Sequence, residues 1–139
     1  MERLRILIVD DAKHIRFILK DVLTNLRLVC DDAENGEQAL HLCFTHQYDF
    51  IVTDWHMPEM DGCYFIKLIR DLSGYQTTPI VILTGDIKAQ DKNQHLGTYP
   101  ELDWLSKDNE PSDLIKYLCR RIFNDDWLGS YHAAILHLS

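Results

Sequence analysis

The sequence predicts an α/β domain built on a five-stranded parallel sheet with helices on both faces. Short apolar runs alternate along the chain with longer segments whose apolar residues recur at helical spacing. The 139 residues have the length of a single domain. Because strands and helices alternate, each helix is expected to act as a right-handed crossover, which makes neighbouring strands parallel.

The first half of the chain contains three expected strands and two expected helices. A strand is expected over residues 4–9, in which Ile6 to Val9 are apolar without alternation, as is typical of a parallel strand covered on both faces. A helix is expected over 12–26, where apolar residues recur every three or four positions. A second strand over 28–33 is followed by a turn at 34–36, a second helix, and a third strand over 50–52.

The second half continues the alternation but is less regular. Gly62 is expected to open a helix that carries apolar residues as far as Leu72, and residues 80–83 form a fourth apolar strand. The segment 87–96 is mostly polar, so a helix there rests partly on Gly97 as a C-terminal stop.

A short fifth strand is expected over 102–105, and a final helix with Ser112 as its N-cap runs to about Ile122. We therefore expect one domain over residues 1–123 and a C-terminal extension over 124–139. Apolar residues at helical spacing in this extension fit three alternatives: a helix packed on the domain, a dimerisation element, or the start of a linker to a further domain.

The composition excludes several classes of protein. A hydrophobic fraction of 46% and a charged fraction of 26% are typical of globular domains. The net charge of -8 argues against nucleic-acid binding, which needs clustered Lys and Arg. No apolar run approaches the ~20 residues of a membrane span or forms a signal peptide, so we expect a cytoplasmic protein without membrane contact. The four cysteines contain no CxxC pair, which argues against a disulfide framework or a zinc site.

Reactive side chains follow four of the five expected strands. Asp10 and Asp11 follow the first strand, Asp54 the third, Thr84 the fourth and Lys107 the fifth. The carboxyl ends of parallel strands share one edge of a sheet, so these groups are expected to converge. Clustered acids repel one another unless a cation joins them. Oxygen ligands favour Mg²⁺, with Mn²⁺ as a substitute.

This set of groups suits phosphoryl chemistry with Asp54 as the acceptor. A carboxylate can take up a phosphoryl group when the donor is positioned in line and the charge on its oxygens is neutralised. Asp10 and Asp11 would hold the metal ion, directly or through water. The Lys107 ammonium and the Thr84 hydroxyl would each meet a phosphoryl oxygen.

The motifs resemble the receiver domains of two-component response regulators, especially the single-domain chemotaxis regulators, over about residues 4–123. The paired acids, the D-x-x-M-P-x-M-D-G segment from Asp54 to Gly62, the Thr84-Gly85 step and the late Lys107 all occur in the family's order. The resemblance implies a flavodoxin-like three-layer sandwich with strand order 2-1-3-4-5. It also implies Mg²⁺-dependent phosphoryl transfer to Asp54 from a phosphohistidine of a histidine kinase or histidine phosphotransfer protein.

Further roles follow from the same resemblance. Mg²⁺ would be held by Asp11, Asp54 and the backbone carbonyl of His56, with Asp10 assisting through water. The chain would promote its own phosphorylation and dephosphorylation without turning over an external substrate, so we do not expect an enzyme in that sense.

The resemblance also implies a switch. Thr84 and Trp104 would move on phosphorylation and change the surface offered to a downstream protein effector, an output domain or a second copy of the chain. The side chains of His56 and Asp86 would flank the phosphoryl group and tune its hydrolysis.

Two departures from the family pattern keep alternatives open. Asp108 follows Lys107 where the family usually has proline, and the segment 87–103 lacks the expected Gly-Ala pattern. A pseudo-receiver that signals without phosphorylation is the main alternative, although the intact acid set counts against it. An aspartyl-phosphate phosphatase ranks last, because such enzymes carry D-x-D whereas Asp10 and Asp11 are adjacent.

Overall fold

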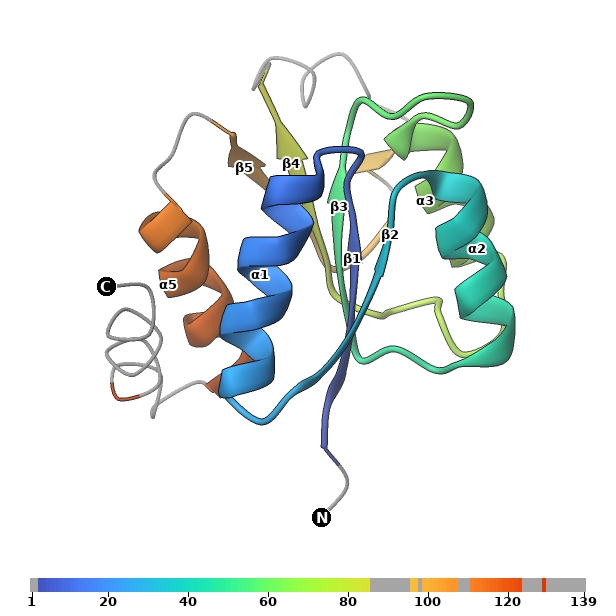
Figure 1. Cartoon of the computed structure of the whole chain (residues 1–139). Helices are drawn as coiled ribbons and strands as arrows, with labels where there is room; N and C mark the ends of the chain where they lie inside the picture. Colours follow the sequence, from blue (N-terminus) through green and yellow to red (C-terminus); the bar gives the residue numbers. More distant parts are fainter. Residues whose placement is uncertain (1–2, 86–95, 98, 108–110, 124–128, 130–139) are drawn as a thin grey trace.

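Five parallel strands form one sheet in the order β2-β1-β3-β4-β5 in a computed structural model of the chain (Figure 1). The structure describes residues 3–85, 96–97, 99–107, 111–123 and 129. Each neighbouring pair of strands is parallel. The strands are β1 (Arg5–Val9), β2 (Val29–Ala33), β3 (Phe50–Asp54), β4 (Ile80–Thr84) and β5 (Leu102–Ser106).

Helices cover both faces of the sheet, so the domain has three layers. Figure 1 shows the helices of the described residues on opposite sides of the sheet. On one side lie α1 (Lys13–Asn25) and α5 (Pro111–Phe123), and on the other lie α2 (Gly36–Thr45) and α3 (Gly62–Arg70). The predicted fold class and strand order are confirmed. The helix expected over 87–96 lies outside the described residues except for Leu96.

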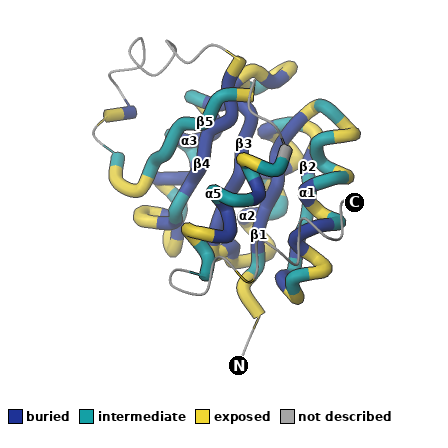
Figure 2. The backbone as a smooth tube through the Cα atoms, turned by 90° about the vertical axis from the view of Figure 1, so that its left-hand side faces the viewer, coloured by how far each residue is buried: buried dark blue, intermediate teal, exposed yellow. Residues whose placement is uncertain are grey.

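Each face of the sheet has its own apolar core. Strand residues alternate between the two cores, as the pleat of a strand requires. On β1, Leu7 and Val9 join the core under α2 and α3, while Ile6 and Ile8 join the core under α1 and α5. Figure 2 shows the three central strands buried and the edge strand β5 half-buried. This double cover explains why β1, β3 and β4 are apolar without alternation.

Two helix starts match their sequence signals and one does not. The side chains of Asn35 and Asp61 cap α2 and α3 by accepting the backbone N–H of Gln38 and Tyr64, each at 2.8 Å. The prediction that Ser112 caps the last helix is wrong, because α5 already begins at Pro111. Proline suits this first helical position since the N–H it lacks would have no partner in the helix.

The ends of the strands also refine the expected boundaries. Asp54 is the last residue of β3 rather than a residue of the following loop, and it pairs in register with Leu83 of β4.

Among the described residues, no helix combines the length and apolar character needed to cross a membrane. The extension over 124–139 lies outside the described residues except for Gly129, so its three alternatives stay predictions.

We expect the variant Arg70→Met to lower the free energy of unfolding by about 2 kcal/mol. Arg70 is 5% exposed at the end of α3, and it donates to the carbonyls of Tyr75 at 2.7 Å and Pro100 at 2.8 Å. Hydrogen bonds from a charged donor contribute ~1.5–3 kcal/mol each, whereas removal of a buried charge offsets part of that loss. Urea unfolding measures the difference.

The matched control is Arg121→Met. Arg121 pairs with Glu101 at 3.1 Å, and both side chains are substantially exposed. An exposed ion pair of this kind contributes at most about 1 kcal/mol. Equal losses in the two variants would show that Arg70 does not anchor α3 to the segment before β5.

Candidate functional site

Three carboxylates meet at the carboxyl edge of the sheet, beyond the ends of β1 and β3. Asp10, Asp11 and Asp54 each offer one oxygen, and these oxygens lie within 4.8 Å of one another. Asp10 and Asp54 are 0% and 2% exposed, while Asp11 is exposed. The order of the strands places β1 beside β3, so two acids from distant parts of the sequence become neighbours.

Lys107 completes this cluster from the end of β5. Its Nζ donates a hydrogen bond to Oδ2 of Asp54 at 2.8 Å and lies 3.3 Å from Oδ2 of Asp10. Its backbone N–H donates to the carbonyl of Thr84 at 2.9 Å, which holds the lysine beside the end of β4. Two buried acids and one ammonium group therefore share a space in which each affects the charge of the others.

The backbone around Asp54 is held on both sides. The N–H of Trp55 donates to the Leu83 carbonyl at 2.8 Å, which continues the pairing with β4 beyond the end of β3. The N–H of His56 donates to Oδ1 of Asp54 at 3.2 Å. Both oxygens of the Asp54 carboxylate thus accept a hydrogen bond, Oδ1 from the N–H of His56 and Oδ2 from Lys107.

Gly62 allows the start of α3 to pack directly against the end of β3. Its N–H donates to the Trp55 carbonyl at 2.9 Å. A Cβ atom at this position would lie 2.8 Å from the carbonyl oxygen of Asp54 and 3.0 Å from Cα of Trp55. The glycine of the D-x-x-M-P-x-M-D-G segment is therefore required by the position of the acceptor strand.

The electrostatics of the cluster favour an added positive charge. Burial raises the pKa of the Asp54 carboxyl, and the charge of Asp10 raises it further against the opposing effect of Lys107. Burial alone would lower the pKa of Lys107, but its hydrogen bond to Asp54 and the charges of both acids outweigh burial and raise it. The lysine therefore stays charged, and one ammonium does not neutralise two buried acids.

The arrangement fits a divalent cation such as Mg²⁺. Oδ2 of Asp10 is buried and, within the described part of the chain, accepts no hydrogen bond, although it lies within ion-pair distance of Lys107. Lys107 donates its hydrogen bond to Asp54 at 2.8 Å and lies farther from Asp10, so this one cation is shared by two buried acids and a second cation would stabilise the cluster. Three carboxylates and no nitrogen or sulfur ligand match the preference of Mg²⁺ for oxygen.

Thr84 and Trp104 lie on β4 and β5, the two strands that follow β3 in the order of the sheet. Thr84 is the last residue of β4 and is fully buried. Trp104, on β5, is half-buried and packs against the core under α2 and α3. Its ring contacts the ring of Trp55, with centroids 4.9 Å apart and planes tilted by 55°.

Trp55 was not singled out by the sequence analysis. It directly follows Asp54, the predicted phosphoryl acceptor, is buried, and forms the contact between that strand end and the ring of Trp104. Its position next to the acceptor was the only available signal in the sequence, and that signal does not show which side chain it meets across the sheet.

The remaining predicted residues differ in what the structure describes. His56 is exposed, so its side chain lies at the surface beside the acceptor, while its backbone carbonyl stays a predicted metal ligand. Asp86 and Asp108 lie outside the described residues.

The four cysteines are free; three are buried and Cys63 is half-buried.

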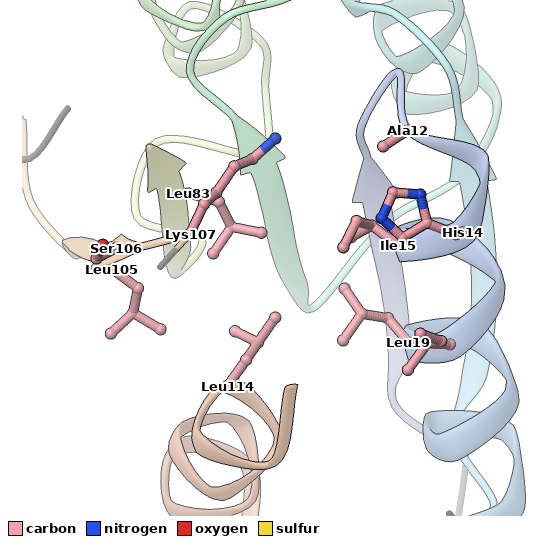
Figure 3. A pocket seen from close by; sticks show the side chains of 10 residues that line it. Ala12, His14, Ile15, Leu19, Leu83, Leu105, Ser106, Lys107 and Leu114 are labelled. Atoms are coloured by element: carbon pink, nitrogen blue, oxygen red, sulfur yellow. The ribbon is translucent and has the colours of Figure 1, made fainter. Parts of the chain in front are cut away.

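A cavity of about 300 Å³ adjoins the site between α1 and α5. Its lining is mainly apolar and comes from α1, β4, β5 and α5 (Figure 3). Lys107 lies at its rim, with the amine directed away from the apolar side chains toward the end of β3 (Figure 3).

The order of the strands and the position of the charged cluster define a doubly wound α/β domain whose site lies at the carboxyl edge of the sheet. Comparison with known proteins identifies the family. Residues 6–119 match the response regulator receiver domain. The chain belongs to the family of response regulator receiver domains, the modules of two-component signal transduction.

Individual relatives agree with this assignment. The chain is 34% identical over 86 residues to the chemotaxis protein CheY of Pseudomonas aeruginosa, covering 61% of this chain and 69% of that protein. It is 37% identical over 95 residues to the sensor protein EvgS of Escherichia coli, covering 68% of this chain but only 8% of that protein. The structure of the chemotaxis response regulator CheY4 of Vibrio cholerae superposes with a TM-score of 0.76 at 31% identity, covering 86% of this chain and 98% of that one.

Proposed function

We propose that the chain is a phosphorylatable receiver in which Asp54 accepts a phosphoryl group from a phosphohistidine. The donor is a histidine kinase or a histidine phosphotransfer protein. The observation that carries this proposal is the contact between Lys107 Nζ and Asp54 Oδ2 at 2.8 Å, beside a buried oxygen of Asp10 that accepts no hydrogen bond in the described part of the chain. The acceptor, a fixed cation and a place for a second cation are thus side by side.

The reaction exchanges one bond for another. A carboxylate oxygen of Asp54 forms the new bond to phosphorus, the phosphorus–nitrogen bond of the donor breaks, and the imidazole departs. Lys107 donates a hydrogen bond to Oδ2 of Asp54, which places its charge where it would neutralise charge on the transferred phosphoryl group. Asp10, Asp11 and Asp54 would hold Mg²⁺, or Mn²⁺ in its place, with the His56 carbonyl as a further ligand. The bound ion would supply charge neutralisation for the phosphoryl oxygens.

The output is a change in a protein-binding surface. The phosphoryl group adds charge and acceptor oxygens at the end of β3, next to Thr84 and the Trp55–Trp104 contact. We propose that Thr84 and Trp104 respond to this charge and alter the face that a downstream effector, an output domain or a second copy of the chain recognises. His56 and Asp86 would tune hydrolysis of the phosphoryl group. The protein would act in the cytoplasm and turn over no external substrate.

The proposal predicts a mass gain that depends on Asp54. Wild type incubated with acetyl phosphate and Mg²⁺ should gain the mass of one phosphoryl group, measured on the intact protein. The gain should be absent in Asp54→Asn and when the metal ion is chelated. Asn keeps the shape of the side chain but cannot form the acyl phosphate.

The mass measurement, together with partner binding, distinguishes the proposed function from the pseudo-receiver alternative. A chain that signals without phosphorylation gains no mass from acetyl phosphate or from a phosphorylated histidine donor, and its Asp54→Asn variant binds partners as wild type does. That pair of results would overturn the proposed function.

A further inference from the structure

Asp10 is held in place at every polar atom except one. Its N–H donates to the Ala33 carbonyl at 3.1 Å, and its Oδ1 accepts from the N–H of Ala12 at 2.9 Å. Its carbonyl oxygen accepts a hydrogen bond from NH1 of Arg16 at 2.7 Å. Only Oδ2, the oxygen that faces Lys107, lacks a hydrogen bond within the described residues.

Arg16, which is not part of the acid cluster, donates a hydrogen bond to the turn between β1 and α1. Arg16 lies in the first turns of α1 and its side chain is only 14% exposed. While NH1 donates to the Asp10 carbonyl, Nε donates to Oδ2 of Asp32 on β2 at 3.1 Å. The guanidinium thus joins the end of β1, the start of α1 and the neighbouring strand β2.

Lys20 contacts the same acid without reaching the turn. Its Nζ donates to Oδ1 of Asp32 at 2.9 Å from the next turn of α1. Both cations contact Asp32, but Arg16 also donates to the Asp10 carbonyl, whereas Lys20 makes no such hydrogen bond within the described residues.

We propose that Arg16 is a positioning residue for the metal site. By fixing the turn between β1 and α1, it holds the Asp10 carboxylate in the orientation that directs Oδ2 toward Lys107 and the acid cluster, where a metal ion would bind. The inference rests on the proposed function, since it concerns Mg²⁺ binding at that site. Groups that orient metal ligands commonly affect the affinity for the ion as strongly as some ligands do.

The positive charge of Arg16 would by itself weaken Mg²⁺ binding, but its ion pair with Asp32 largely cancels this charge. A cation near Mg²⁺ repels it, yet the guanidinium is paired with Asp32, whose pKa is lowered by its hydrogen bonds and charge pairing with Lys20 and Arg16 against the effect of burial. The acid therefore stays ionised beside Arg16. Loss of the positioning contact is expected to exceed the relief of repulsion.

The test compares Mg²⁺ affinity in three variants by isothermal titration calorimetry. Arg16→Met should raise the dissociation constant for Mg²⁺ by about tenfold, the lower end of the range for groups that orient ligands. Arg16→Lys should fall between Arg16→Met and wild type, because a single amine lacks the two separate nitrogens, Nε and NH1, with which the guanidinium reaches Asp32 and the Asp10 carbonyl. Lys20→Met is the matched control and should bind Mg²⁺ as wild type does.

A second measurement needs no metal ion. In the metal-free protein, hydrogen exchange of the Ala12 amide, which is bonded to Oδ1 of Asp10, should be faster in Arg16→Met than in Lys20→Met. A role confined to overall stability would speed exchange in both variants in proportion to their stability and leave Mg²⁺ affinity unchanged.

The outcomes separate this inference from the proposed function. Wild-type Mg²⁺ affinity in Arg16→Met, or tighter binding, would overturn the inference while the phosphoryl acceptor role stands. If Arg16→Met does not fold, equal affinities in Arg16→Lys and Lys20→Met would overturn it instead. Failure of wild type to bind Mg²⁺ and to gain a phosphoryl group would overturn the proposed function itself.

Discussion

Replacing Lys107 with methionine is expected to slow phosphorylation of Asp54 by acetyl phosphate by about 100-fold or more. The Lys107 amine donates a hydrogen bond to Oδ2 of Asp54, the proposed acceptor, at 2.8 Å. Removing one preorganised charge partner from a developing oxyanion costs ~10²–10³ in rate. Rates of mass gain at saturating Mg²⁺ measure the effect.

The same variant should also unfold more easily without metal. Asp10 and Asp54 are almost fully buried, and Lys107 is the ammonium between them. Leaving buried acids without their cation costs ~3–5 kcal/mol, and the partial exposure of Lys107 places our expectation at about 3 kcal/mol. Mg²⁺ should recover part of this loss, so the ion should stabilise Lys107→Met more than it stabilises wild type.

Lys13→Met serves as the control, because Lys13 is exposed at the start of α1 and the ion pairs of Asp10 and Asp54 within the described residues involve Lys107 instead. We expect its rate and stability to match wild type. A Lys107→Met protein with an undiminished rate, and with the same Mg²⁺ stabilisation as wild type, would contradict the role assigned to the lysine.

Replacing Gly62 with alanine is expected to reduce phosphorylation by about 100-fold and to destabilise the fold by about 2 kcal/mol. The new Cβ would lie 2.8 Å from the Asp54 carbonyl oxygen and 3.0 Å from two backbone atoms of Trp55. These are backbone atoms of a buried strand end, so they cannot rotate away as a side chain could. Overpacking of this kind costs ~1–3 kcal/mol, and a displacement of ~1 Å at a reacting group can cost ~10² in rate.

Gly97→Ala makes the same chemical change where no atom lies within 4 Å of the new Cβ. It should leave the rate of mass gain unchanged, and urea unfolding should show little difference from wild type. If Gly62→Ala behaved like Gly97→Ala, close packing of α3 against the acceptor strand would not be needed for function.

The fold was predictable because its central strands β1, β3 and β4 are buried on both faces. Runs such as Ile6–Val9 and Ile80–Leu83 carry no polar residue, so each strand is evident from composition alone. The reactive groups were predictable for a related reason. Each directly follows or ends such a run, and parallel topology brings these ends to one edge.

Contacts that depend on neighbours across the sheet could not be predicted in the same way. Arg16 contacts the Asp10 carbonyl and Asp32, but a charged residue on an amphipathic helix normally faces solvent. The rings of Trp55 and Trp104 are in contact although β4 lies between β3 and β5 in the sheet, and the sequence does not show this pairing. The first residue of α5 was missed since Pro111 and Ser112 are both suited to a helix start.

The central claim is that Asp54 itself receives the phosphoryl group, and chemical mapping of the modified residue tests it most directly. The protein is treated with acetyl phosphate and Mg²⁺, reduced with borohydride, which converts an acyl phosphate to the corresponding alcohol, and digested for peptide sequencing by mass spectrometry. We predict reduction of residue 54 to homoserine in wild type and no reduced aspartate in Asp54→Asn. Homoserine at position 10 or 11, or none anywhere despite bound Mg²⁺, would contradict the assignment of Asp54 as the acceptor.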